Sequence, residues 1–216
     1  MLSRRLFLAG AAAAAMSHGG VPAHAEAILT DDGLYRQPWF IDSFLELADD
    51  LDAAADKGKR LVVMWELKGC PYCRDTHLIN FARPDIENYV KEHFDVLQLN
   101  IIGAREVTDF DGQKLGEKQM AAKYGLRGTP VFQFFPERAK GLGAKPPRER
   151  EVLRMLGYRQ PDEFKQMFVF VAERIYERMS FHDYLRTPSL YPSPASTPTL
   201  PSPASGGGIK GGGGGG

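Results

Sequence analysis

The sequence has only two cysteines, Cys70 and Cys73, so any thiol chemistry of the chain is confined to this pair. It also lacks an excess of charge of either sign, because 27 lysines and arginines are matched by 27 aspartates and glutamates. Such a balance gives no reason to expect nucleic acid or an anionic membrane surface as a partner. The 216 residues leave room for one domain with a proper core, or for two small ones.

The amino-terminal apolar stretch is too short to span a membrane as a helix. It follows Arg4 and Arg5 and ends in small residues at Ala25, which predicts a cleaved bacterial signal peptide over residues 1–25. The opening Ser-Arg-Arg-Leu-Phe-Leu also resembles the twin-arginine export motif, with a Sec signal as the alternative. Either route predicts a periplasmic protein, and a disulfide persists in that oxidising compartment.

The carboxyl-terminal end has almost no apolar residues that could anchor it. Residues 187–216 are dominated by proline, serine and glycine and carry a single charge, Lys210. Such a composition cannot bury a core, so this tail is predicted to be disordered. We interpret this tail as a spacer without function; a flexible tether is the alternative.

Residues 34–186 alternate helical and strand patterns, which predicts one α/β domain. Apolar runs predict strands at 60–67, 95–101, 130–135 and 151–156. Amphipathic patterns predict helices at 38–51, from Cys70 to the interruption at Pro84, at 86–94, at 117–124 and at 162–179. The first helix should bury one face, made of Phe40, Phe44, Leu47, Ala48 and Leu51.

The order of these elements predicts the layers of the domain. A strand–helix–strand unit implies two parallel strands joined by a right-handed crossover. The last two strands follow each other closely and form an antiparallel pair. With helices on both faces, the expected fold is a three-layer α/β sandwich around a mixed central sheet.

The cysteine pair lies between an apolar strand and the start of a helix, with Gly69 breaking the strand. Positions i and i+3 share one helical face, so the two sulfurs can meet. At a helix N-terminus, Cys70 faces free N–H groups and the positive dipole end, which favour the thiolate, and Pro71 suits the first turn. Cys70 is therefore the expected attacking nucleophile, and Cys73 the thiol that resolves the mixed disulfide.

Other readings of the pair are weaker. A structural disulfide would close a very short loop and restrain the unfolded chain little. A zinc site could recruit His77 and His93, but the chain has no second cysteine pair. Haem attachment requires histidine directly after Cys73, where the chain has Arg74. Redox chemistry without a bound cofactor is the favoured prediction.

The segment Cys70-Pro71-Tyr72-Cys73, together with Gly128-Thr129-Pro130 at the start of a later strand, resembles the thioredoxin superfamily. In that family the proline is cis and lies beside the two sulfurs. The resemblance implies that Thr129 and Pro130 border the pair and that the Thr129 backbone pairs with a substrate segment as an added strand. Gly69, Pro71 and Tyr72 would flank the substrate, with the small Gly69 leaving the approach to Cys70 open.

The export signal, the Cys-Pro-Tyr-Cys segment and the ending with Leu-Gly-Tyr and then Pro-Asp-Glu-Phe (156–164) make the chain similar to the SoxW-type periplasmic thioredoxins of sulfur oxidation. Two positions depart from thioredoxins proper: Gly69 replaces the tryptophan before the first cysteine, and Met64 replaces a buried aspartate. The thioredoxin proton relay and partner surface therefore do not carry over directly.

The resemblance implies a thiol–disulfide oxidoreductase that reduces disulfides or thiol-bound sulfur on exported proteins. Reduction in an oxidising compartment needs a resupply of electrons, which implies a membrane transporter of the DsbD or CcdA kind as donor. Two alternatives stay open: an oxidase that forms disulfides, and a redox-inactive module that binds a partner or carries metal.

Two further residues are candidates for the site. Glu66 interrupts an apolar strand four residues before Cys70, on the face of Met64, and could accept the proton of Cys73. The alternatives for Glu66 are an ion pair with Lys68 or an exposed strand end. Phe110 lies in the loop 102–116, which should flank the site and shape partner choice.

Two other features are expected to stay outside the chemistry. His77 is expected on the surface or behind the site. The basic loop 138–150 leaves the far end of the strand that begins at Pro130, so it is expected to be a solvated loop away from the sulfurs.

Overall fold

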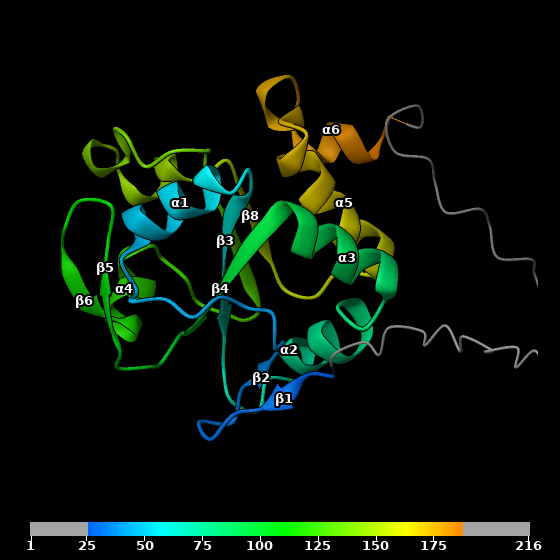
Figure 1. Cartoon of the computed structure of the whole chain (residues 1–216), viewed down its shortest axis with the longest axis horizontal. Helices are drawn as coiled ribbons and strands as arrows, with labels where there is room; N and C mark the ends of the chain where they lie inside the picture. Colours follow the sequence, from blue (N-terminus) through cyan, green and yellow to red (C-terminus); the bar gives the residue numbers. More distant parts are fainter. Residues whose placement is uncertain (1–25, 188–216) are drawn as a thin grey trace, which may run out of the picture.

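A four-stranded sheet in the order β4–β3–β7–β8 forms the centre of the protein, as a computed structural model shows (Figure 1). The strands are β3 (Arg60–Glu66), β4 (Phe94–Asn100), β7 (Val131–Phe134) and β8 (Leu153–Leu156). β3 runs parallel to β4 and antiparallel to β7, and β8 runs antiparallel to β7. The predicted mixed sheet is therefore confirmed.

The structure describes residues 26–187. The predicted signal peptide at 1–25 and all but the first residue of the predicted tail at 187–216 lie outside the described residues. Within the described part of the chain, no helix has both the length and the apolar character needed to cross a bilayer.

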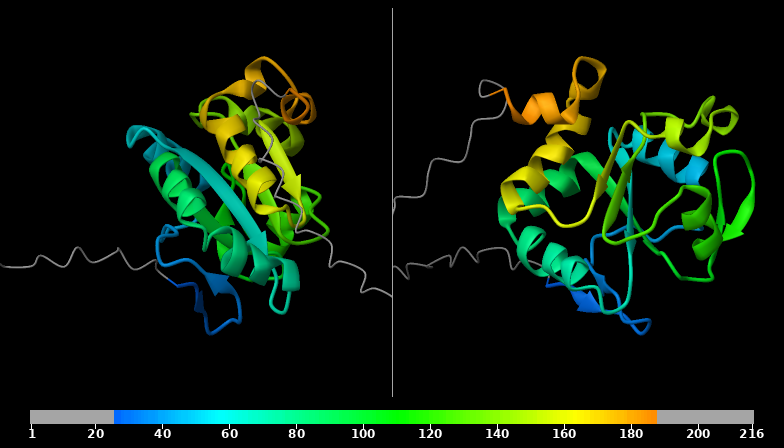
Figure 2. Two further views of the ribbon diagram at one scale, coloured as in Figure 1. Left: turned by 90° about the vertical axis from the view of Figure 1, so that its right-hand side faces the viewer. Right: turned by 180° about the vertical axis from the view of Figure 1, so that it is seen from behind.

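Helices cover both faces of the sheet, as the sequence predicted (Figures 1 and 2). One face carries α1 (Leu47–Asp56), α4 (Glu117–Lys123) and a small hairpin of β5 (Glu106–Thr108) and β6 (Lys114–Gly116). The other carries α3 (Pro84–His93) and α5 (Pro161–Ala172). The shorter elements are β1 (Ile28–Leu29), β2 (Tyr35–Arg36), α2 (Pro71–Asp75), η1 (Thr76–Asn80), η2 (Leu142–Ala144), η3 (Pro147–Arg150), η4 (Ile175–Glu177) and α6 (Phe181–Leu185).

Strand β3 divides the core in two because its side chains alternate between the faces of the sheet. Val62 and Met64 pack in the cluster under α3 and α5, whereas Val63 and Trp65 pack in the cluster under α1 and α4. Phe168 of α5 is the centre of the first cluster. Its ring centroid lies 5.0–5.3 Å from those of three other rings, in the edge-to-face arrangements that aromatic pairs favour, and these rings are Phe94, Phe134 and Phe164.

The first helix was predicted to begin near residue 38, and this is wrong: α1 begins at Leu47. The Ile41 N–H donates to the Val96 carbonyl at 3.0 Å, so this segment is bound to the edge of β4 and not to a helical turn. Leu45 then takes a positive φ of 62°. As a result Phe44, predicted to be buried, is fully exposed at 100%.

Two other boundaries differ from the predictions. The segment 102–116, expected to be irregular, contains the β5–β6 hairpin, and the β1–β2 hairpin was not predicted. The last helix was predicted to reach residue 179 but ends at Ala172, because Arg174 takes a left-handed φ of 56°. Ile175 nevertheless points inward from the short turn η4.

Two phenylalanines provide a matched test of this core. Phe168→Ala should lower the free energy of unfolding by about 3–5 kcal/mol, because it leaves a cavity among the rings around it. Phe44→Ala should change it by no more than about 0.5 kcal/mol, because Phe44 is fully exposed. Urea unfolding of the oxidised protein measures both values, and equal losses for the two variants would contradict this core.

Candidate active site

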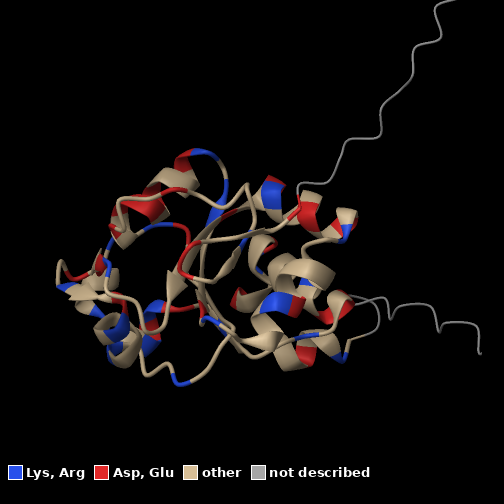
Figure 3. Cartoon of the chain, turned by 90° about the horizontal axis from the view of Figure 1, so that it is seen from below, with Lys and Arg blue, Asp and Glu red and all other residues tan. Residues whose placement is uncertain are grey.

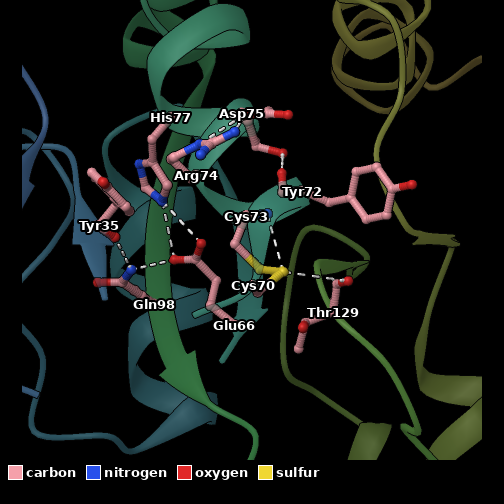
Figure 4. Close-up of a disulfide and its surroundings, with 11 residues drawn as sticks. Tyr35, Glu66, Cys70, Tyr72, Cys73, Arg74, Asp75, His77, Gln98 and Thr129 are labelled. Atoms are coloured by element: carbon pink, nitrogen blue, oxygen red, sulfur yellow. Dashed lines mark hydrogen bonds and ion pairs between the residues drawn. A yellow bond between two sulfur atoms is a disulfide. The ribbon is translucent and has the colours of Figure 1, made fainter. Parts of the chain in front are cut away.

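The turn after β3 delivers the cysteine pair to the end of the sheet (Figure 4). Gly69 has a φ of 76°, a conformation that glycine adopts without strain, and Cys70 follows as the N-cap of α2. Cys70 and Cys73 form a disulfide, and the Cys73 N–H donates to Cys70 Sγ at 3.1 Å. Cys70 is partly exposed and Cys73 is buried, so the sulfur open to a partner is that of Cys70.

The loop before β7 forms a wall beside this disulfide. The Thr129–Pro130 peptide bond is cis, as the family resemblance implied. The Thr129 carbonyl oxygen lies 3.7 Å from Cys70 Sγ. The Gly157 N–H donates to the Pro130 carbonyl at 2.8 Å and ties this wall to the end of β8. The structure therefore brings Thr129 and Pro130 to the cysteines.

Glu66, the last residue of β3, is buried behind the pair at 1% exposure. Both of its carboxylate oxygens lie 3.0 Å from His77 Nε2. The Gln98 side-chain amide also donates to Glu66, and it donates to the Tyr35 carbonyl at 2.5 Å. Glu66 is therefore neither an exposed strand end nor the partner of Lys68 in an ion pair, which were the two alternatives for this position.

His77 lies behind the site, one of the two places expected for it, and not on the surface. Its side chain is fully buried and faces Glu66. The reason is local: His77 lies four residues after the buried Cys73, a spacing that puts both residues on one face of consecutive helical turns. That spacing, next to a carboxylate at the end of the adjoining strand, was the signal in the sequence.

Gln37 orients this histidine ring. Its side-chain N–H group donates to the His77 carbonyl at 3.1 Å, and the same nitrogen lies 3.4 Å from His77 Nδ1. Because Gln37 presents a donor, Nδ1 acts as the acceptor and the ring proton is on Nε2. The tautomer that fits these contacts donates from Nε2 to the Glu66 carboxylate.

A cavity of about 210 Å³ joins Glu66 to both sulfurs. Its wall includes Glu66, Cys70 and Cys73, together with Tyr35 and Arg74. Glu66 and both cysteines therefore border one space at the end of β3.

Pro71 and Tyr72 surround the exposed side of the pair, as expected of substrate-flanking residues. Both are exposed, as is Gly69, and an added Cβ on Gly69 would meet no atom within 4 Å. The Tyr72 ring stacks on that of Tyr158, with centroids 6.3 Å apart. This leaves the approach to Cys70 open.

The prediction for Phe110 is wrong, because the structure does not bring it to the cysteines. Its ring packs on Phe135, with centroids 4.9 Å apart. Phe135 follows the carboxyl end of β7, whereas Thr129 precedes its amino end. The residue just before the loop does contact the site, because the Ile101 N–H donates to the Glu66 carbonyl at 2.9 Å.

The basic loop 138–150 was expected to be a solvated loop away from the sulfurs, and its last part borders a groove that neighbours of the cysteine pair also line, although neither cysteine does. Arg148 lines a groove of about 440 Å³ together with Tyr72 and Thr129. The loop leaves the far end of β7, as predicted, and its last residue is anchored by the buried side chain of Arg150.

The two histidines considered for a metal site have other partners. His77 is bound to Glu66, and the His93 ring lies 4.4 Å from that of Tyr89. Among residues 26–187, no group of three or more histidine, cysteine, aspartate or glutamate side chains is arranged to hold a metal ion.

Comparison with known proteins gives the family. Among solved structures, the chain is similar to a thioredoxin-fold protein from Helicobacter pylori, with 17% identity and a TM-score of 0.47 over 63% of this chain and 92% of that one. It is also similar to a thioredoxin from Thermus thermophilus, with 22% identity and a TM-score of 0.43 over 58% and 83% of the two chains.

The oxidised C-terminal domain of DsbD from Neisseria meningitidis has 17% identity and a TM-score of 0.38, over 60% of this chain and 96% of that one. A search among curated proteins found no match. A family model of the thioredoxin-like domain matches residues 47–172, more than half of the chain. The chain therefore belongs to the thioredoxin-like family.

The Glu66–His77 contact predicts how stability responds to mutation. His77→Leu should lower the free energy of unfolding of the oxidised protein by about 2–3 kcal/mol, because it removes a hydrogen-bond donor from a buried carboxylate. His182→Leu is the control, since His182 is 74% exposed. Urea unfolding measures both, and an unchanged stability of His77→Leu would contradict the assigned contact.

Proposed function

We propose that this chain is an exported thiol–disulfide oxidoreductase that reduces disulfides on other exported proteins. The observation that carries the proposal is the Cys70–Cys73 pair itself: its exposed sulfur lies beside the Thr129 carbonyl, and its buried sulfur borders a cavity shared with Glu66. Membership of the thioredoxin-like family supports the same chemistry.

The reaction begins from the reduced pair. The Cys70 thiolate attacks one sulfur of a substrate disulfide, the substrate S–S bond breaks, and one substrate thiolate leaves. Cys73 then loses its proton and attacks Cys70 Sγ in the mixed disulfide, which releases the second substrate thiolate. The substrate gains two electrons, and two protons complete its thiols, while the protein ends with the Cys70–Cys73 disulfide that the structure contains.

Glu66 takes the proton of Cys73 in the second step. It is the acidic residue that borders the same cavity as Cys73. His77 and Gln98 hold the carboxylate in place through their hydrogen bonds, and His77 acts as a positioning residue because it does not border that cavity. Met64, which stands where thioredoxins carry their buried aspartate, has no proton to exchange.

The partners follow from this chemistry. Each turnover consumes the reduced pair, so an exported reductase needs electrons from across the membrane, and a thiol transporter of the DsbD or CcdA kind would supply them. The narrower resemblance to SoxW-type thioredoxins adds thiol-bound sulfur on carrier proteins as a substrate. Disulfide formation in the opposite direction is the alternative activity of the same site.

Substitution of each cysteine tests the proposal. Cys70→Ser should abolish reduction of a protein disulfide such as that of insulin, because the attacking thiolate is gone. Cys73→Ser should instead accumulate mixed disulfides with its substrates, which non-reducing gel electrophoresis detects. Full reductase activity in Cys70→Ser would contradict the proposal, as would tight metal binding by a reduced protein that shows no reductase activity.

The role of Glu66 predicts a defect confined to the second step. Glu66→Gln should slow release of the second substrate thiol at neutral pH by about a hundredfold, since general-base assistance is lost, while attack by Cys70 continues. Rapid-quench measurement of the mixed disulfide separates the two steps. Glu92→Gln is the control, because Glu92 is 74% exposed, and an unchanged lifetime in Glu66→Gln would remove Glu66 from the mechanism.

A further inference from the structure

The open side of the disulfide carries a groove with an unusual charge. Figure 4 shows Thr129 on one side of the disulfide and Glu66 with His77 on the other. The groove of about 440 Å³ lies on the Thr129 side. Its lining residues come from α2, from the segment between α4 and β7, from the start of β7, from η3, and from β8 and the residue after it. They are Tyr72, Gly125, Arg127, Gly128, Thr129, Val131, Arg148, Arg154, Leu156 and Gly157.

Three arginines line this groove, and no carboxylate does. Arg154 is neutralised, because its guanidinium pairs with the buried carboxylate of Glu151. Arg127 and Arg148 are exposed, and neither has an ion pair or side-chain hydrogen bond with any of residues 26–187. The groove therefore presents two positive charges that the described residues do not neutralise.

Arg148 is held at the groove by a buried anchor two residues further on. The Arg150 side chain is 3% exposed and donates to Asp109 at 2.7 Å and to Asp111 at 3.0 Å. It also donates to the Lys145 carbonyl at 2.8 Å, which closes the turn η3 on itself. Burial of Arg150 thus fixes the position of the backbone at Arg148.

This positive charge is local. The chain as a whole is neutral, and basic and acidic residues are interspersed over the molecule (Figure 3). The net charge of the chain therefore does not attract anionic substrates over long range. Any preference for anionic groups must come from this groove.

The remaining lining fits an extended polypeptide. The Thr129 N–H makes no hydrogen bond within the described part of the chain, so it can pair with the backbone of a substrate segment. Tyr72 and Leu156 are 57% and 58% exposed and offer apolar contacts on either side. A small disulfide would reach Cys70 without using these groups.

From these observations we infer that the groove selects polypeptide segments that carry aspartate or glutamate beside the reactive cysteine. Arg127 and Arg148 pair with the flanking carboxylates while the Thr129 backbone binds the segment next to Cys70. This inference rests on the proposed function, since it names the class of protein substrate that the same cysteines reduce.

Three disulfide-linked peptides test the inference. They are identical except that the residues flanking the cysteine are aspartate, asparagine or lysine, and the reduced protein is assayed with each at low salt. The acidic peptide should be reduced with a kcat/KM about fivefold above that of the asparagine peptide, and the lysine peptide should be the poorest. The preference should shrink at about 0.5 M salt, where charges are screened.

The variants assign the effect to the groove. Combining Arg127→Gln with Arg148→Gln should bring the acidic-to-asparagine ratio of kcat/KM close to one. Arg178→Gln is the matched control: Arg178 is also exposed, but it follows η4, near the start of β3, and should keep the ratio of the natural chain.

The outcomes separate this inference from the proposed function. Equal reduction of all three peptides by the natural chain would overturn the charge preference and leave the reductase standing. An acidic preference that survives in the double variant would also overturn it. Failure to reduce any of the peptides, or insulin, would overturn both.

Discussion

Strand β3 is the element on which the rest of the structure depends. It pairs with β4 on one side and β7 on the other, so it is the middle of the sheet that both halves of the core pack against. Its carboxyl end delivers Glu66 and, after the turn at Gly69, Cys70. The antiparallel pairing with β7 places the start of that strand, and so Pro130, at the same end of the sheet. One register thus brings together the thiols, the carboxylate and the proline wall.

The two sides of the disulfide are built for different tasks. On the inner side, Glu66 and His77 are almost completely removed from solvent and bound to each other. Such an environment suits a carboxylate that is to accept a proton from a nearby thiol and not from bulk water. On the outer side, Arg127 and Arg148 are exposed and have no carboxylate in the groove that they line. Under the proposed function, chemistry is thereby separated from recognition, and we expect that each can be altered by substitution without rebuilding the other.

Much of this arrangement could be predicted from the sequence, because it depends on local patterns. Apolar runs marked the four strands of the sheet, and Cys70 and Thr129-Pro130 marked the ends that meet. The helical periodicity before Leu47 led to a wrong prediction of a helix there, because a hydrogen bond to β4 and a positive φ at Leu45 impose a different backbone path. The approach of Arg148 could not be predicted, since it depends on burial of Arg150 against Asp109, a contact 41 residues apart in the chain.

The reduction potential of the Cys70–Cys73 pair tests the central claim most directly, because the direction of electron flow depends on it. For this two-electron couple, about 30 mV corresponds to about 1.4 kcal/mol, so equilibration with a thiol buffer of known potential resolves the alternatives well. A reductase should have a value near that of thioredoxin, about −270 mV. A value near −120 mV, the range of disulfide-forming oxidases, would contradict the account.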